Sequence, residues 1–145
     1  GLTTVVTTEA NFFDDATLSG NGTINGLVNM NVDANLAPGT SPGIITTGDL
    51  TLDNNNNYFE LNGPNPGTEH DQIVVTGTVT IVSGTTLSLL GGYANANSDE
   101  VVLIENDGTD PISGTFDGLG EGTAVSFGDF NDIENSSVIG LYISV

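Results

Sequence analysis

His70 is the one histidine of the chain, and an acidic residue stands on each side of it, Glu69 before and Asp71 after. An imidazole next to a carboxylate has the composition of a general base or of a metal site. A zinc site would need further ligands, and the chain has no second histidine and no cysteine. We therefore expect His70 to lie in solvent on a loop, without a catalytic or metal-binding role.

The chain has 19 acidic residues, and pairs of carboxylates can hydrolyse glycosidic bonds. Enzymes that cleave acidic polysaccharides commonly also use arginine or lysine, and the chain contains neither. This argument does not exclude a carboxylate pair that hydrolyses a neutral glycan, but no segment of the sequence identifies such a pair. The sequence therefore predicts no enzyme, no catalytic residue and no required cofactor.

Two acidic segments, Glu105–Asp110 and Gly128–Asn135, place several oxygen donors in turn-like sequence. Calcium takes six to eight oxygen ligands, and main-chain carbonyls of a turn can complete its shell. Neither segment matches the EF-hand loop or the nonapeptide repeat of calcium-binding solenoids. We expect solvated turns at both places, and we keep Ca2+ as the one ion that would relieve the unpaired charge.

The charge of the chain excludes several kinds of partner. The chain has no lysine or arginine, and its formal net charge is -19 at pH 7. Binding to the phosphates of a nucleic acid, or to an anionic membrane surface, needs cations that this chain lacks. Copies of so anionic a protein repel one another at low salt, so assembly would need screening ions, divalent cations or large buried interfaces.

The remaining composition indicates a folded, secreted protein. Hydrophobic residues make up 37% of the 145 residues, more than disordered acidic chains usually carry. There is no cysteine to form disulfides, and no apolar run approaches the ~20 residues of a membrane-spanning helix. A chain that starts at Gly1 without a recognisable signal peptide fits a protein whose leader has been removed.

Strand patterns dominate the sequence, and turn residues separate them. Alternating or β-branched runs recur along the chain, and Asn-Gly, Pro-Gly and Asp-Gly pairs mark turns about every 8 to 12 residues. No segment has the pattern of a strong helix. The clearest strand-like runs are Leu2–Thr8, Gly22–Val32, Gly48–Asp53, Asn57–Gly63, Asp71–Gly92, Asp99–Asn106, Gly122–Phe130 and Ser137–Val145.

A degenerate repeat links two of these runs. Thr46–Leu52 and Val75–Ile81 share a pattern of Thr, Gly, any residue, then an apolar, Thr, apolar triplet, and they start 29 residues apart. A looser version lies within Gly20–Met30. This separation is close to the length of one turn of a β-solenoid.

Several segments together resemble a known bacterial pattern. The run APGTSPGIITTGDLTL from Ala37 to Leu52 is followed by YFELNG, DQIVVTGTVTI and TTLSLL, and later by VVLIENDGTDPISGTFDGLGEGTAVSFG. Over about Asn21–Gly128 the chain resembles the β-helical passenger segments of bacterial autotransporters and related extracellular adhesin-like proteins. The resemblance implies a right-handed parallel β-solenoid with a role in adhesion, aggregation or surface display, and it supplies no active-site residue. Because family members continue into more turns and a membrane-embedded barrel, we expect a chain ending at Val145 to be a stand-alone secreted subunit.

The sequence predicts one all-β domain over residues 1–145, with a parallel β-solenoid as the first choice of fold. A β-sandwich of the jelly-roll type is the alternative, which the short strands and the irregular repeat spacing favour. The expected core residues mostly lie on the alternating strands. They are Ile24, Val28, Met30, Ile44, Leu50, Leu52, Phe59, Leu61, Ile73, Val75, Val79, Ile81, Leu87, Leu89, Val101, Leu103, Phe116 and Val125.

Both ends of the chain have strand character, and residues 1–10 are a candidate for pairing or exchange with another copy. A terminal strand can add to a neighbouring sheet, and a head-to-tail contact of this kind grows a filament of identical subunits. The sequence therefore predicts a structural, extracellular bacterial protein of the cell surface, a self-assembling subunit of a fibre, surface layer or biofilm. The alternative is an adhesive module whose Asn62–Asp71 loop binds a glycan or a partner cell.

Overall fold

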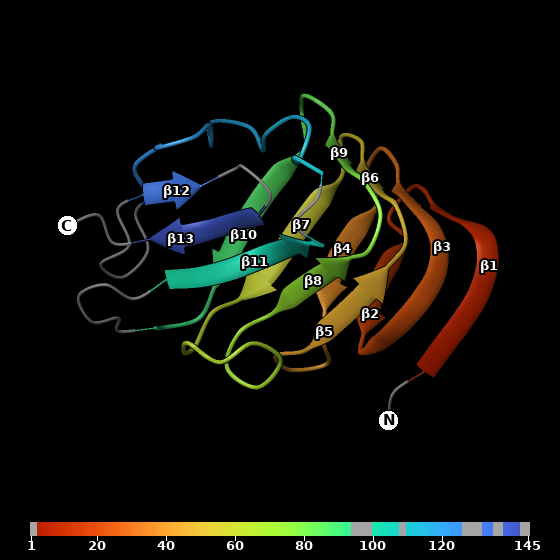
Figure 1. Cartoon of the computed structure of the whole chain (residues 1–145), viewed down its shortest axis with the longest axis horizontal. Helices are drawn as coiled ribbons and strands as arrows, with labels where there is room; N and C mark the ends of the chain where they lie inside the picture. Colours follow the sequence, from red (N-terminus) through yellow and green to blue (C-terminus); the bar gives the residue numbers. More distant parts are fainter. Residues whose placement is uncertain (1–2, 94–99, 108–109, 126–131, 135–137, 143–145) are drawn as a thin grey trace.

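The computed structural model describes residues 3–93, 100–107, 110–125, 132–134 and 138–142, and Figure 1 shows their arrangement. The described part of the chain is all-β, as the sequence predicts. It contains no helix, and therefore none long and apolar enough to cross a membrane. The strands are β1 (Thr3–Phe12), β2 (Thr17–Gly20), β3 (Gly22–Met30), β4 (Asn35–Pro38), β5 (Ile44–Thr47), β6 (Leu50–Leu52), β7 (Asn56–Glu60), β8 (Gln72–Val75), β9 (Val79–Ile81), β10 (Thr86–Leu90), β11 (Glu100–Asn106), β12 (Asp132–Glu134) and β13 (Val138–Tyr142).

Strands far apart in the sequence lie side by side, because the chain returns to the same two sheets in the same order. In the larger sheet, β3 pairs with β5 through its first half and with β6 through its second half. β5 then pairs with β8, and β6 pairs with β9. The smaller sheet has the order β10-β7-β4-β2. All pairings among the described strands β1 to β11 are parallel.

The separation between paired residues grows along the chain. Thr17 pairs with Asn35, 18 positions later, whereas Asn56 pairs with Thr86, 30 positions later. Leu50 pairs with Val79 at the 29-residue separation that the repeat in the sequence predicts. The repeat therefore marks two segments that lie against each other as neighbouring strands.

The corners after β1, β3 and β6 need a left-handed backbone. Asp15, Asp33 and Asn54 have φ angles of 62°, 64° and 52° there. Aspartate and asparagine tolerate this region better than other residues with a side chain. Main-chain hydrogen bonds of 3.2 Å run from Asp15 N to Asp33 O and from Asp33 N to Asn54 O. Through these Asp and Asn residues, successive corners lie against one another as the paired strands do.

One core runs between the two sheets, and most of the expected core residues belong to it. Ile24, Leu87, Leu89 and Val125 are partly buried against it, and the others except Ile44 are buried. The expectation for Ile44 is wrong, because the inward parity of β5 falls on Ile45, which is 3% exposed. Ile44 points away from the core toward Gly67. The core also includes apolar residues that the sequence did not single out, namely Ala34, Leu36, Tyr93, Ile104, Ile112 and Ile139.

Candidate functional site

The end of the molecule formed by β1 and β2 has open strand edges. β1 pairs with β3 on one side, and no described strand pairs with its other side. β2 likewise ends the smaller sheet, with β4 as its one neighbour among the described strands. Figure 1 shows β1 at one extreme of the molecule and β12 and β13 toward the other. A strand edge without a partner presents free N–H and C=O groups to an incoming strand.

Apolar side chains accompany these open edges. Val5 is 47% exposed and Val6 is 80% exposed, both on β1. Between β1, β2 and the start of β3 lies a hollow of about 360 Å³, called here the end hollow. Its apolar lining comes from Val5, Leu18, Ile24 and Ile45, and its polar lining is uncharged, comprising Ser19, Gly20, Asn21, Gly22, Thr23 and Thr40. The apolar core is therefore open at this end of the molecule, beside β1 and β2.

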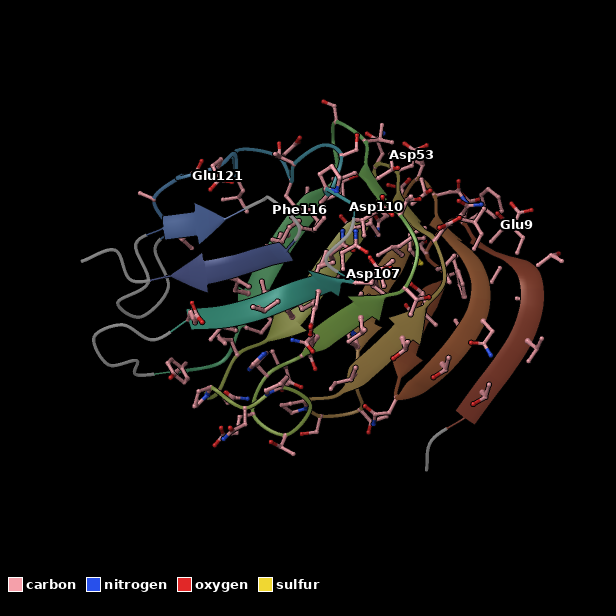
Figure 2. All side chains as sticks on the ribbon, in the orientation of Figure 1. Glu9, Asp53, Asp107, Asp110, Phe116 and Glu121 are labelled. Carbon is pink, nitrogen blue, oxygen red and sulfur yellow. The ribbon has the colours of Figure 1, made fainter. Side chains whose placement is uncertain are left out.

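The lining of the end hollow contains no charged residue, although the whole chain has 19 acidic residues. The acidic residues nearest to β1 and β2 in the sequence are Glu9 on β1 and Asp14 and Asp15 in the corner after it. The carboxylate of β1 itself, on Glu9, accepts a 2.8 Å hydrogen bond from Asn29 Nδ2. Figure 2 shows Glu9 toward this end and Glu121 toward the opposite one. A second anionic chain would therefore meet less electrostatic repulsion at the end hollow than at parts of the surface that carry carboxylates.

The opposite end differs, because antiparallel strands cover the last parallel one. β13 pairs antiparallel with β11, and β12 pairs antiparallel with β13. Beside them, Ser113 covers the edge of β9 through hydrogen bonds between Ile81 N and Ser113 O and between Ser113 N and Val79 O, of 2.7 and 3.0 Å. Phe116, 1% exposed, belongs to the core in the same region. In the described residues, continuation of the parallel stack is thus blocked at β11 in the larger sheet, whereas β10 ends the smaller sheet with β7 as its one described neighbour.

His70 does not lie in solvent, and that expectation is wrong: the residue is 1% exposed. Its Nδ1 lies 3.1 Å from the carbonyl oxygen of Gly63, and its Nε2 lies 3.3 Å from that of Val102. The ring thereby connects the loop after β7 to β11. Burial lowers the pKa of His70 below its ordinary 6.5, although the two carbonyls and the charge of Glu69 act to raise it.

The neighbouring carboxylates do not join His70 in a site. Asp71 is 2% exposed, and its two oxygens accept hydrogen bonds from Gly43 N and Glu60 N, of 2.9 and 2.7 Å. Burial raises the pKa of Asp71 above its ordinary 3.8, against the lowering effect of these two N–H groups. Glu69 accepts from the main chain and side chain of Asn65. The Asp71 carboxylate thus bonds main-chain N–H groups outside the loop, and the Glu69 carboxylate bonds Asn65 within the loop. The His70 ring lies beside main-chain carbonyls.

The sequence contains one motif that sequence analysis passed over. Gly39–Gly43 has the Gly-x-Ser-x-Gly spacing of a nucleophile elbow, with Ser41 at its centre. That motif requires a turn from a strand into a helix, whereas these residues connect β4 to β5. Both ring nitrogens of His70 lie beside main-chain carbonyl oxygens, and neither makes a hydrogen bond to Ser41. In the part of the chain that the structure describes, Ser41 is therefore not paired with a base.

A second hollow lies where the loop after β7 meets β8 and β11. It has a volume of about 250 Å³ and is called here the loop hollow. Its lining comprises Pro64, Pro66, His70, Gln72, Glu100, Val102 and Glu105. Glu100 and Glu105 are exposed, whereas His70 and Gln72 are buried. Composition could not locate this hollow, because its residues come from three segments separated in the sequence.

The two candidate calcium segments are only partly described. In Glu105–Asp110, Asn106 Nδ2 donates to Asp110 O and Asp107 N donates to Asn106 Oδ1, both at 2.8 Å. Figure 2 labels Asp107, which follows the end of β11. Of Gly128–Asn135, all but Asp132–Glu134 falls outside the described residues. Among the described side chains, no group of three or more His, Asp or Glu residues is arranged to hold a metal ion.

Comparison of the chain with protein-family models, with curated protein sequences and with solved structures gave no match in any of the three.

Proposed function

We propose that the parallel part of this chain is a β-solenoid. Successive strands pair in parallel with strands 18 to 31 positions further on, as in Thr17 with Asn35 and Ile73 with Ile104. A jelly roll is built from antiparallel strands, which occur here only where β13 meets β11 and β12 in the described part of the chain. The stacked left-handed corners at Asp15, Asp33 and Asn54 also support a repeating coil.

On this fold we propose that the chain is a structural, extracellular protein that self-assembles through the β1 and β2 end. The observation that carries the proposal is the difference between the two ends. One end joins open edges of both sheets to an uncharged hollow with an apolar lining, whereas at the other end antiparallel strands cover the larger sheet and only β10 of the smaller sheet keeps an edge without a described partner. The β1 and β2 end favours addition of another strand. The fibre or surface layer that the sequence predicts requires this end to meet a different surface of the next copy, such as the β10 edge, because contact between two β1 ends alone would close as a dimer.

The pairing of β1 favours docking onto its free edge over exchange of residues 1–10 between copies. Residues Thr3–Phe12 pair with Gly22–Met30 of the same chain along most of their length. Exchange would have to break this pairing first, whereas docking leaves it in place. The extracellular location of the assembly is supported by the bacterial surface proteins that the sequence resembles.

The proposal is tested by sedimentation velocity and electron microscopy of the purified chain over a range of concentration and salt. We expect association that strengthens with salt, since screening reduces repulsion between chains of net charge -19. Val6→Asp should raise the dissociation constant by about tenfold or more, because a carboxylate would be buried in the contact. Val82→Asp is the matched control, since Val82 is also exposed and follows β9, away from β1.

Two outcomes would overturn the proposal. One is a chain that stays monomeric at every concentration and salt tested. The other is equal weakening by Val6→Asp and Val82→Asp, which would place the contact elsewhere or show that only total charge matters.

A second candidate function is the adhesive module, and the loop hollow is the observation that favours it. The Asn62–Asp71 loop that the sequence singles out contributes Pro64, Pro66 and His70 to this hollow. A glycan or a partner cell is the ligand that the sequence leads us to propose for it. Electron microscopy that shows discrete particles, together with retention on immobilised glycans, would favour this function over assembly.

A further inference from the structure

The side-chain donors of the loop hollow are already in use. Gln72 Nε2 donates to Val102 O at 3.0 Å, and the His70 ring faces the carbonyls of Gly63 and Val102. The orientation of the Gln72 amide follows from this contact, because the reverse orientation would set two oxygens against each other. No residue that the structure describes donates to its Oε1, and Gln72 is 5% exposed.

The remaining polar side-chain atoms of the lining are also acceptors. Glu100 and Glu105 contribute carboxylate oxygens, which accept hydrogen bonds. Together with Gln72 Oε1 they form a lining of acceptors, which is complementary to a ligand rich in hydrogen-bond donors. Ammonium and guanidinium groups are donors only, whereas a sugar hydroxyl is both donor and acceptor.

The size and charge of the hollow point the same way. Its volume of about 250 Å³ is below the roughly 300–1,000 Å³ of sites for drug-sized ligands, so it suits one small group and not a whole ligand. Two carboxylates attract a cation, and Pro64 and Pro66 supply apolar surface for the carbon atoms next to it. The chain has no lysine or arginine with which to fill the site itself.

We propose that the loop hollow binds an organic cation, an ammonium or guanidinium group, through Glu100, Glu105 and the Oε1 of Gln72. Because a second copy of this chain has no such side chain, the ligand belongs to a different molecule, either a free amine or a basic side chain of another protein. The proposal does not depend on assembly through the β1 end.

The test uses the single histidine as a reporter. The ring signals of His70 in a ¹H–¹³C NMR spectrum are unambiguous, since the chain has one histidine. At constant ionic strength, the Val6→Asp chain is titrated with acetyl-arginine amide, acetyl-lysine amide, butylamine, the neutral acetyl-glutamine amide, methyl glucoside and calcium chloride. We expect saturable shifts with the three organic cations, with Kd on the order of 1 mM for so small a contact. Butylamine and the two amino-acid amides separate the two sources, since a tighter fit of acetyl-arginine amide would indicate a protein side chain.

Matched variants locate the binding. The double variant Glu100→Gln and Glu105→Gln should weaken binding about tenfold, since each ion pair at an exposed site is modest. The control, Asp14→Asn and Asp15→Asn, removes the same charge from a corner beside β1, and asparagine tolerates its left-handed φ angles of 42° and 62°. This control should bind as the parent chain does.

A second readout needs no change at the hollow. Saturation with acetyl-arginine amide should lower the pKa of His70 further, because a positive charge close to the ring disfavours the imidazolium form. An unchanged pKa overturns the proposal, and so does equal loss of binding in both double variants, which would show diffuse attraction to the anionic chain. Shifts produced equally by acetyl-glutamine amide, methyl glucoside or calcium chloride would assign the hollow to a different ligand class and refute it.

Discussion

The two ends of the parallel stack finish the same core in different ways. At the β11 end, antiparallel β13 pairs with the last parallel strand, and Leu103, Ile104 and Ile139 are fully buried. At the β1 end, Leu18 and Ile24 remain partly exposed around a hollow, and the edge of β1 has no described partner. The difference teaches that the larger sheet is closed by a change of strand direction at β11, and that an edge without this change is suited to further pairing.

The largest expected effect compares the same substitution at the two ends. Leu103→Ala should lower the free energy of unfolding by about 2–5 kcal/mol, because it leaves a cavity beneath covering strands. Leu18→Ala should cost about 1 kcal/mol, since its side chain already borders open space. Urea denaturation of dilute protein measures both. Similar losses for the two variants would break the comparison, because they would mean that the β1 end is covered in solution.

The attachment of β1 to the stack depends on a glycine. A Cβ at Gly26 would lie 2.1 Å from the carbonyl oxygen of Thr7, and the φ of Gly26 is 152°. Gly26→Ala should therefore cost about 2–3 kcal/mol and loosen β1, as increased hydrogen exchange of residues 3–12 would show. Gly20→Ala is the control for φ alone, since Gly20 has a φ of 96° and no atom within 4 Å of its Cβ position. An equal effect of the two changes would remove the close approach of β1 as the cause.

Asp71 connects the middle of the stack, and its replacement should have a moderate effect. Its carboxylate accepts from both Gly43 N and Glu60 N, and an asparagine has one oxygen for these two donors. Asp71→Asn should cost about 1–3 kcal/mol, because one buried N–H loses its acceptor. Asp117→Asn, which affects an exposed bond to Gly84 N, should cost less in the same urea experiment. An Asp71→Asn variant as stable as the parent chain would contradict the role given to the second acceptor oxygen.

The smallest effect concerns pH. Because the pKa of His70 is below 6.5 in the fold, the unfolded chain binds the proton more readily. The stability that neutral His70 provides is complete above pH 6.5, and it is lost as the pH falls from 6.5 toward the lower folded pKa. Asp71 acts in the opposite direction at lower pH, since its folded pKa is above 3.8. Urea midpoints of the parent chain and of His70→Gln should converge as the pH falls through this window, and parallel curves would contradict the assignment.

The sequence predicts much of the fold because strands leave a regular mark. The alternation of Leu50, Leu52, Val79 and Ile81 indicates inward positions, and the 29-residue repeat indicates which segments pair. Parity fails where two apolar residues are adjacent, as at Ile44 and Ile45, because either one fits an inward position. The choice then depends on the partner strand, which the sequence alone does not specify.

Buried polar residues are the part that the sequence could not predict. The Asp53–Asn57 run has the composition of an exposed corner, yet Asn55 and Asn57 are fully buried and hydrogen-bond to each other at 3.1 and 3.3 Å. His70 is buried for a similar reason, since its ring N–H can donate to a main-chain carbonyl, that of Gly63 or that of Val102. Some of these partners are distant in the sequence, such as Thr86 O for Asn57 and Val102 O for His70, and residue type and local pattern do not indicate them.

The increasing distance between paired residues, from 18 positions at Thr17 to 30 at Asn56, protects this chain from misalignment. A protein with turns of equal length can slide by a whole turn and satisfy its ladders almost as well. In this chain, a shift of one strand to the wrong neighbour would crowd a long connecting segment into the space of a short one. The reverse shift would stretch a short segment across the span of a long one. Each strand is thereby matched to a single neighbour, and fidelity in folding comes from irregularity in length.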